Sequence, residues 1–167
     1  MTLDQLNKLP ADLALSEFLR CCGCRKWAHD MTARRPFRST ESLDNAADDV
    51  WNTLSADEWR EAFAHHPKIG DLEGLKERFA GTARWAAGEQ AGVAAATDDL
   101  LQKLAEGNRS YEGKFGYIFI VCATGKSAGE MLALIHERLE NEPGAEIHVA
   151  ASEQAKITKV RLKKLFR

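Results

Sequence analysis

The sequence has 167 residues, enough for one domain with a well-buried core and too few for two ordinary domains. Hydrophobic residues make up 44% of the chain and charged residues 29%, which argues against disorder. The 23 basic and 25 acidic side chains give a formal net charge of -2. This balance provides no global electrostatic reason for nucleic-acid binding, and we expect no nucleic-acid partner.

Targeting signals are not evident in the sequence. No window approaches the roughly 20 apolar residues of a membrane span, and the first residues lack a basic region followed by an apolar run. The C-terminal Leu165-Phe166-Arg167 is not a peroxisomal address. We therefore expect a cytoplasmic protein without a membrane partner.

Three of the four cysteines are crowded together, at Cys21, Cys22 and Cys24, with His29 five residues further on. This spacing does not match a pair of zinc-ligand motifs, and Cys22 falls on the apolar stripe of its helix. A buried structural cysteine is the better explanation, and we assign no metal. In an unexported protein the cysteines should be free thiols.

Capping signals divide the first part of the chain into helices. Residues 2–5 have the capping-box form and predict a short helix, and Pro10 suits the first turn of a second helix that Gly23 ends. Residues 24–36 are irregular or briefly helical. Ser39 or Thr40 caps the next helix, whose apolar face comprises Leu43, Ala47, Val50, Trp51 and Leu54.

A second capping box, at residues 55–58, opens a helix that ends near Ala64, with Trp59 and Phe63 in the core. A short helix with Leu72, Leu75 and Phe79 on one face and a long helix over residues 86–111 should follow. A third capping box begins at Ser127, and its helix ends near residue 143. The last helix is expected from about residue 145 to residue 166.

The apolar run from Phe115 to Ala123 is typical of a strand, but the chain offers no second strand to pair with it. A lone strand would leave its backbone donors and acceptors unsatisfied. We therefore predict an extended segment between helices, whose backbone groups are offered to a ligand. The predicted fold is all-α, a single domain over residues 1–167 with one core.

Two adjacent imidazoles, His65 and His66, precede Pro67 at the end of a predicted helix. A residue before proline is displaced from the α region, so His66 should leave the helix with a restricted backbone. An imidazole fixed where a helix meets a loop suits proton transfer near neutral pH. For either histidine alone, a simple helix stop is the commoner explanation, so the interpretation depends on other residues.

Two further charged residues favour a functional site. Arg161 falls on an apolar stripe of the last helix, and a buried guanidinium needs an anionic partner, either a carboxylate or a ligand. Glu89 and Gln90 lie near the start of the long helix, where the helix dipole favours an ionised Glu89. The basic residues of 156–167 lack interleaved aromatic side chains, so a solvated helix face explains them better than a nucleic-acid patch.

Four motifs occur in order along nearly the whole chain: His66 to Gly70; Trp85 with Glu89-Gln90; Lys114 to Ala123; and Lys156-Ile157 with Arg161-Leu162. Together they resemble the 2-oxo-4-hydroxy-4-carboxy-5-ureidoimidazoline (OHCU) decarboxylases. The resemblance implies an all-helical bundle, typically a homodimer. It also implies decarboxylation of OHCU to (S)-allantoin, the last step from urate, without cofactor or metal.

By this resemblance His66 is the catalytic acid and Pro67 lines the site. Residues 86–90, from Ala86 to Gln90, form one wall, and the segment Phe119, Ile120, Val121, Cys122 and Ala123 supplies backbone contacts to the substrate ring. One departure concerns Ala86, because the family has a serine there in a serine-x-x-Glu-Gln motif. A missing N-cap typically costs about 1 kcal/mol, so we expect Thr82 or water to cap the helix.

The chemistry of decarboxylation agrees with these residue types. Decarboxylation leaves electron density on the carbon that held the carboxylate, and we expect that carbon to receive a proton on one face. We expect Glu89 to bind hydroxyl and ureido donors, Gln90 to orient the ring, and the backbone of residues 120–123 to hold its amides. Arg161 would bind an anionic oxygen, and His66 would deliver the proton.

Two alternatives stay open at this point. His65 is a rival for the acid role, although its place in the last helical turn suits packing or capping better. A small helical module could also bind a purine-derived ligand without converting it. Depletion of the substrate by the purified protein, compared with the spontaneous rate, separates this binding module from an enzyme.

Overall fold

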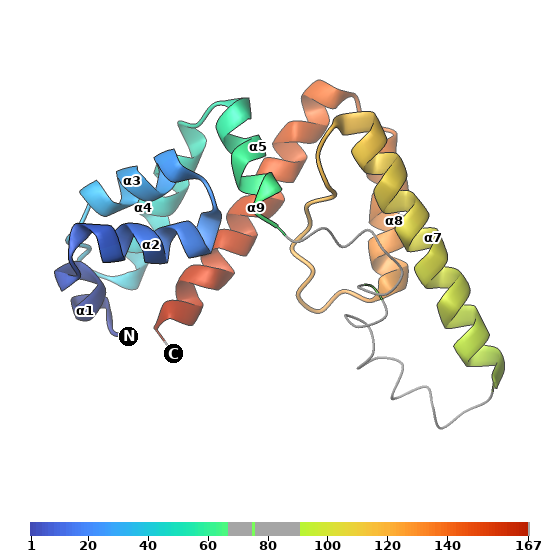
Figure 1. The fold of residues 1–167 in the computed structure, drawn as a ribbon, viewed down its shortest axis with the longest axis horizontal. Helices are drawn as coiled ribbons and strands as arrows, with labels where there is room; N and C mark the ends of the chain where they lie inside the picture. The colour runs from blue at the N-terminus through green and yellow to red at the C-terminus, as the bar shows by residue number, and fades with distance from the viewer. Residues whose placement is uncertain (67–74, 76–90, 167) are drawn as a thin grey trace. The chain divides into compact units, whose positions relative to one another are not determined.

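The structure is a computed structural model that describes residues 1–66, 75 and 91–166, with the backbone alone for residues 91–97. In this part of the chain it contains eight helices and no strand (Figure 1). The all-α prediction is therefore confirmed. None of the helices described here is long and apolar enough to cross a membrane.

The chain divides into two compact units. Unit 1 comprises Met1–His66, Ile120–Cys122 and Ile147–Arg167, and unit 2 comprises Pro67–Phe119 and Ala123–Glu146. The two units are described separately below. The prediction of a single domain over residues 1–167 stays a prediction.

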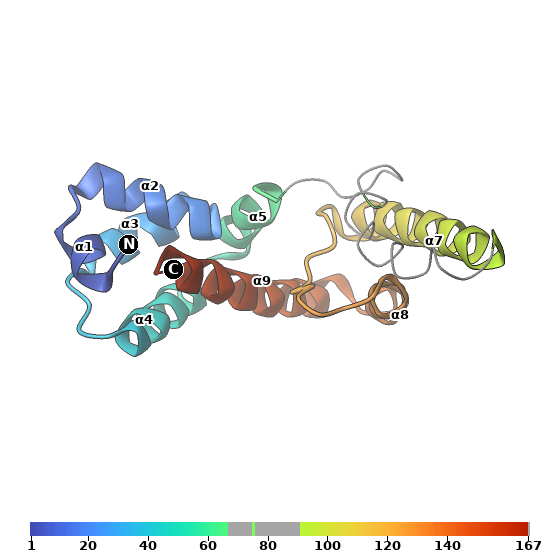
Figure 2. The ribbon, with the colours of Figure 1, turned by 90° about the horizontal axis from the view of Figure 1, so that it is seen from below.

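Unit 1 is built from the helices of the N-terminal part and most of the last helix. Helix α9 (Pro143–Leu165) lies beside α4 within this unit (Figure 2), because Trp51 Nε1 donates to the Ala151 carbonyl at 3.0 Å and Lys159 Nζ pairs with Asp48 at 2.5 Å. The other helices of the unit are α1 (Leu3–Lys8), α2 (Ala11–Cys22), α3 (Arg25–Ala33), α4 (Thr40–Asn52) and α5 (Ala56–Ala64).

Local capping chemistry sets most helix starts. The three predicted capping boxes are present, with Thr2, Ser55 and Ser127 each accepting from the backbone N–H three residues on. Ser39 caps α4 in the same way. Pro10 is the N-cap of α2 rather than a residue of its first turn, and Gly23 ends α2 in the left-handed region with φ 84°.

Residues 24–36 are more regular than the sequence indicated. Cys24 caps the nine-residue helix α3, with its sulfur accepting from the Trp27 N–H at 3.5 Å. Trp27 is fully buried, and its Nε1 donates to the Ala47 carbonyl at 3.1 Å. Packing of this tryptophan, a tertiary effect, stabilises a helix whose local sequence signal is weak.

The core of unit 1 follows the predicted apolar faces, with two differences. Phe63 is fully buried as expected, but Trp59 is only half-buried and stacks on Trp51 at a centroid distance of 6.1 Å. Within unit 1 the buried stripe of α9 comprises Ile147, Ala150, Ala151, Gln154, Thr158 and Leu162. Arg161 is therefore half-buried at the edge of this stripe rather than on it.

Unit 2 contains α7 (Ala91–Phe115) and α8 (Ala128–Leu139), which lie side by side (Figure 1). At Gly107 an added Cβ would come within 2.9 Å of Ile135 Cγ2, so the small residue permits this close packing. The predicted start of the long helix, residues 86–90, lies outside the described residues. So does the predicted short helix before it, except for Leu75, which is buried.

The segment between α7 and α8 is neither helix nor strand from residue 116 to residue 127, so the predicted apolar segment between helices is confirmed, although its first residue, Phe115, still belongs to α7. The aromatic rings of Tyr111, Phe115, Tyr117 and Phe119 pack together at its start, with Tyr111 and Phe115 centroids 4.6 Å apart.

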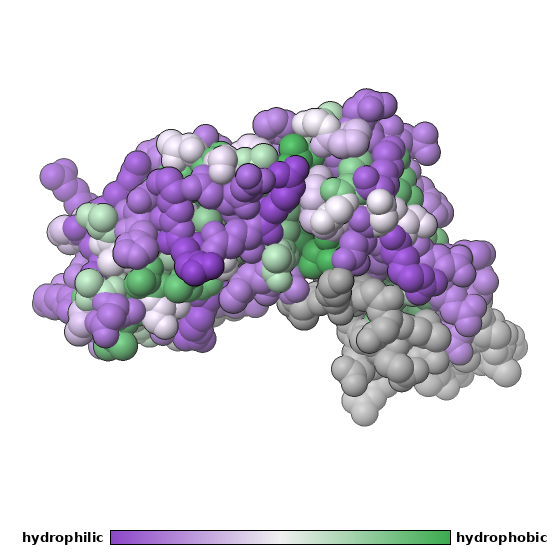
Figure 3. All heavy atoms as spheres, turned by 45° about the horizontal axis from the view of Figure 1, so that its top comes forward, coloured by the Kyte–Doolittle hydropathy of each residue, from purple (hydrophilic) through white to green (hydrophobic). Residues whose placement is uncertain are grey.

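Hydrophilic residues predominate on the face of the molecule in Figure 3. Among the described residues, the exposed large hydrophobic side chains are Leu13 and Val149.

Candidate active site

The end of α5 places His66. The helix ends at Ala64 with His65 as its C-cap, and the His66 N–H donates to the Phe63 carbonyl at 3.2 Å. This confirms the predicted helix exit before Pro67. The C-terminal end of α2 packs closely here, because a Cβ on Gly23 would lie only 2.4 Å from His65 Cβ.

Both ring nitrogens of His66 contact side chains of α9. His66 Nε2 lies 2.6 Å from Gln154 Oε1, and His66 Nδ1 lies 3.3 Å from a terminal nitrogen of Arg161. Positions 154, 158 and 161 share one face of α9, because they follow the i, i+4, i+7 spacing. The structure thus brings together two of the three predicted catalytic residues, His66 and Arg161.

The electrostatic surroundings favour a neutral His66. Burial lowers the pKa of this half-buried imidazole, and the Arg161 and His65 charges lower it further. The hydrogen bond with Gln154 opposes them but does not cancel their effect, so the pKa stays below its usual value. An anion bound beside Arg161 would offset the arginine charge and make protonation of His66 easier.

Arg161 has no carboxylate partner among the described residues. Its terminal nitrogens donate to the Cys21 carbonyl at 3.2 Å and approach His66 Nδ1, and neither acceptor carries a negative charge. The sequence-based expectation that Arg161 has an anionic partner, either a protein carboxylate or a ligand, stays a prediction. The anionic oxygen predicted for Arg161 stays a prediction.

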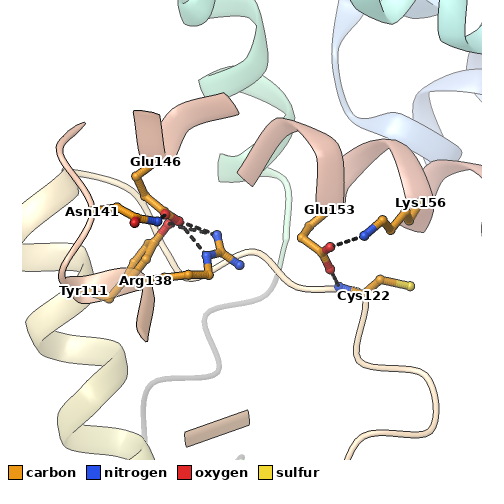
Figure 4. A network of polar contacts seen from close by, with 7 residues as sticks. All are labelled: Tyr111, Cys122, Arg138, Asn141, Glu146, Glu153 and Lys156. Carbon is orange, nitrogen blue, oxygen red and sulfur yellow. Dashed lines mark hydrogen bonds and ion pairs between the residues drawn. The ribbon is translucent and has the colours of Figure 1, made fainter. Parts of the chain in front are cut away.

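Helix α9 also fixes the predicted substrate-binding backbone. The Cys122 N–H donates to Glu153 Oε2 at 2.7 Å, and Lys156 Nζ pairs with Glu153 Oε1 at 2.5 Å (Figure 4). Ile120 is buried, whereas Val121, Cys122 and Ala123 are half-buried. Adjacent residues of α9 thus hold the Cys122 backbone and His66, both within unit 1.

Phe119, the last residue of unit 2 before this segment, lies against a buried ion pair. The Arg138 guanidinium lies 4.6 Å from the centre of the Phe119 ring, and its Nε donates to Glu146 Oε1 at 2.7 Å. Asn141 donates to the other carboxylate oxygen at 2.7 Å, and the Tyr111 hydroxyl donates to Glu146 as well (Figure 4). Burial raises the pKa of Tyr111, which keeps its hydroxyl a donor.

The remaining predicted site residues, Pro67, Ala86, Glu89 and Gln90, lie outside the described residues, as does the predicted helix cap Thr82. Their roles stay predictions. Sequence reasoning overlooked Gln154, although a polar amide on a mostly apolar stripe was a usable signal. It also missed the Arg138–Glu146 pair and Glu153, whose partner Cys122 lies 31 residues away along the chain.

Burial disfavours the thiolate forms of the three clustered cysteines. Cys21, Cys22 and Cys24 are buried free thiols, as predicted. Burial raises the pKa of Cys21 to about 11 and that of Cys22 to about 12, so both stay protonated at neutral pH. His29 is exposed, and the part of the chain that the structure describes contains no group of three side chains able to hold a metal ion.

Residues 7–163 match the family model of the OHCU decarboxylases. The chain belongs to the OHCU decarboxylase family. This match confirms the resemblance that the four sequence motifs indicated.

Curated relatives extend this finding. The chain is 40% identical over 158 residues to the "Uric acid degradation bifunctional protein TTL" of Arabidopsis thaliana, covering 93% of this chain and 48% of that protein. It is 31% identical to the "Uric acid degradation bifunctional protein" of Bacillus sp. (strain TB-90), covering 100% of this chain and 32% of that protein. The chain therefore spans half or less of these two relatives.

A relative of similar length is the "2-oxo-4-hydroxy-4-carboxy-5-ureidoimidazoline decarboxylase" of Amia calva, which is 27% identical over 99% of this chain and 95% of that protein. Among solved structures, an OHCU decarboxylase in the presence of (S)-allantoin aligns with a TM-score of 0.72 at 38% identity, covering 90% of this chain and 96% of that chain. An (S)-allantoin synthase, at 18% identity and a TM-score of 0.69 over 98% of this chain and 54% of that chain, shares the fold.

Proposed function

We propose that this chain decarboxylates OHCU to (S)-allantoin without a metal or a cofactor. The observation that carries the proposal is the His66–Arg161 pair, an imidazole and a guanidinium 3.3 Å apart with no carboxylate on the arginine among the described residues. An acid beside an anion-binding group suits a carboxylate substrate that must take up a proton. The similar structure solved with (S)-allantoin supports the same substrate and product.

The reaction needs one bond to break and one proton to enter. The bond between the ring carbon and the carboxylate breaks, carbon dioxide leaves, and the electron pair moves into the ring. The ring nitrogen that receives the electron pair takes up a proton, and the carbon that bears the hydroxyl becomes a carbonyl and releases its hydroxyl proton. The neighbouring carbon that bears the ureido group, and not the carbon that held the carboxylate, takes a proton on one face. Relative to the carboxylate form of the substrate, the net reaction consumes one proton.

The residues divide these tasks. Arg161 binds an anionic oxygen of the substrate, and His66, whose charge state responds to that anion, delivers the proton. The backbone of residues 120–123, which Glu153 fixes at Cys122, holds the ring amides. Glu89 binds the hydroxyl and ureido donors and Gln90 orients the ring, while Pro67, Ala86 and Phe119 line the site.

The proposal includes a homodimer, which the family resemblance implies, and a cytoplasmic location, which the sequence analysis led us to expect. Light scattering of the purified chain tests the oligomeric state directly. A mass twice that of one chain is expected, and a monomer at micromolar concentration would exclude the dimer.

The decisive experiment for the reaction follows the loss of OHCU, generated from urate, with and without the protein. We expect the wild-type chain to accelerate the loss, His66→Ala to abolish most of the acceleration, and His65→Ala to retain it. A protein that binds the compound but leaves the spontaneous rate unchanged would be a binding module. Retained turnover in His66→Ala with lost turnover in His65→Ala would assign the acid to His65.

A further inference from the structure

Gln154 is a fully buried amide whose two ends both have partners. Its Oε1 lies 2.6 Å from His66 Nε2, and its Nε2 donates to Thr158 Oγ1 at 3.2 Å. Thr158 is itself buried. A buried amide with this set of partners has little freedom to rotate, because each lost hydrogen bond would leave a polar group unsatisfied.

The donors around His66 fix which ring nitrogen carries the hydrogen. An arginine guanidinium has only donors, so His66 Nδ1, 3.3 Å from Arg161, must present its lone pair when the ring is neutral. The hydrogen then lies on Nε2 and needs an acceptor, which the Gln154 oxygen supplies. With the amide reversed, its NH2 group would face the Nε2 hydrogen, and two donors would oppose each other.

We propose that Gln154 is a positioning residue that holds neutral His66 in the form protonated on Nε2. As a result Nδ1, on the side of Arg161, is the nitrogen that takes up and delivers the catalytic proton. The role of Nδ1 in catalysis rests on the proposed decarboxylase function, whereas the tautomer of His66 is a property of the protein alone. No role for Gln154 followed from the four motifs of the family resemblance.

The proton cycle balances. When an anionic substrate oxygen binds Arg161, Nδ1 accepts a proton from solvent and the ring becomes an imidazolium. Carbon dioxide leaves, and the substrate's hydroxyl proton is replaced by one on the ring nitrogen that receives the electron pair. The proton on Nδ1 passes to the ring carbon that bears the ureido group, and His66 returns to the neutral form with its hydrogen on Nε2. Among the residues that the structure describes, the charged groups that influence this histidine are Arg161 of α9 and His65, the C-cap of α5.

The first test is nitrogen NMR of histidine-labelled protein without substrate, with the His66 signals assigned by their loss in His66→Asn. Above the pKa of His66 we expect the shifts of a ring protonated on Nε2. In Gln154→Leu, which has no acceptor, the Nε2 signal should move toward a mixture of the two tautomers. A wild-type ring protonated on Nδ1, or shifts unchanged in Gln154→Leu, would overturn the proposal.

The second variant, Gln154→Glu, places a carboxylate at Nε2 without changing the side-chain length. We expect it to raise the pKa of His66 by about one unit or more. Gln102→Glu, on the exposed face of α7, makes the same substitution away from the histidine and should leave that pKa unchanged. A pKa that responds equally in both variants would contradict a specific contact.

Kinetic measurements separate the effect of Gln154 on the His66 tautomer from the role of His66 Nδ1 in proton delivery. In Gln154→Leu we expect kcat to fall about 10- to 100-fold with KM nearly unchanged, because orientation of the acid is lost while Arg161 still binds the anion. An Nε2-protonated ring in a wild-type protein that shows no OHCU turnover would refute the function and leave the tautomer assignment standing. Full kcat in a folded Gln154→Leu would refute the role of Gln154 in catalysis.

Discussion

At the residue scale, the charge of His66 is set by three neighbours with different effects. Burial of the ring and the nearby Arg161 and His65 charges lower its pKa, and the Gln154 hydrogen bond partly opposes them. The folded protein therefore binds fewer protons than the unfolded chain just below the usual histidine pKa of about 6.5. Stability from this group is present above that pH and is lost as the pH falls toward the folded-state pKa.

Replacing Arg161 with a neutral side chain should raise the pKa of His66. In Arg161→Gln the pKa of His66 should rise toward its usual value, because a positive charge 3.3 Å away is removed. The same change should raise KM for an anionic substrate. An NMR pH titration of His66 measures the pKa, with Arg60→Gln on the exposed face of α5 as the matched control.

The same titration can contradict the contact between Arg161 and His66. A His66 pKa that falls or does not move in Arg161→Gln, while Arg60→Gln behaves like the wild type, would mean that the two side chains are not in contact in solution. The effect of Arg161 on substrate binding would then need another explanation.

At the element scale, the site depends on how α2, α5 and α9 meet. Gly23 ends α2 at φ 84° in close contact with His65, and α9 supplies Glu153, Gln154 and Arg161. Glu153 and Gln154 are neighbours in sequence and hold different parts of the site. A shift of α9 within unit 1 would therefore disturb the Cys122 backbone and His66 together.

Gly23→Ala tests the contact between α2 and His65. The new Cβ would lie 2.4 Å from His65 Cβ, and the positive φ disfavours any side chain. We expect the free energy of unfolding in urea to fall by about 1–3 kcal/mol, with a lower kcat as His66 is displaced. Gly113→Ala, where no atom lies within 4 Å of the new Cβ, should be neutral or slightly stabilising. Equal stability of the two variants would contradict the close packing.

Local chemistry explains which elements were predictable. The capping boxes at Thr2, Ser55 and Ser127 and the helix exit before Pro67 depend on residues within a few positions, so the sequence predicts them. Helix α3 depends on burial of Trp27 against Ala47, twenty residues away. The Glu153–Cys122 contact also joins distant residues, and no local pattern indicates it.

At the scale of the whole molecule, the fold class and family followed from the sequence, whereas the polar interior did not. Hydrophobic periodicity predicts which faces are buried but not which charged residues are buried in pairs. Arg138 and Glu146 are 5% and 0% exposed, and their pairing depends on the approach of α8 to the start of α9. The four motifs gave the family because they span the chain in order.

Global stability should reflect this buried pair. Glu146→Ala removes the carboxylate that Arg138, Asn141 and Tyr111 all bind, which typically costs about 3–5 kcal/mol when one partner of a buried pair is lost. Urea unfolding measures the loss. Asp99→Ala, which breaks the exposed pair with Lys103 on α7, should change the midpoint little. Similar midpoints for both variants would contradict a stabilising role for the buried network.

The most direct measurement of the central claim is the circular dichroism of allantoin formed from OHCU that is generated in situ from urate. A positioned acid at His66 predicts rapid formation of optically active (S)-allantoin with the wild-type chain. His66→Ala should return the signal to the spontaneous background. Racemic product at the spontaneous rate from the folded wild-type protein would contradict the account and leave a helical module that binds without catalysis.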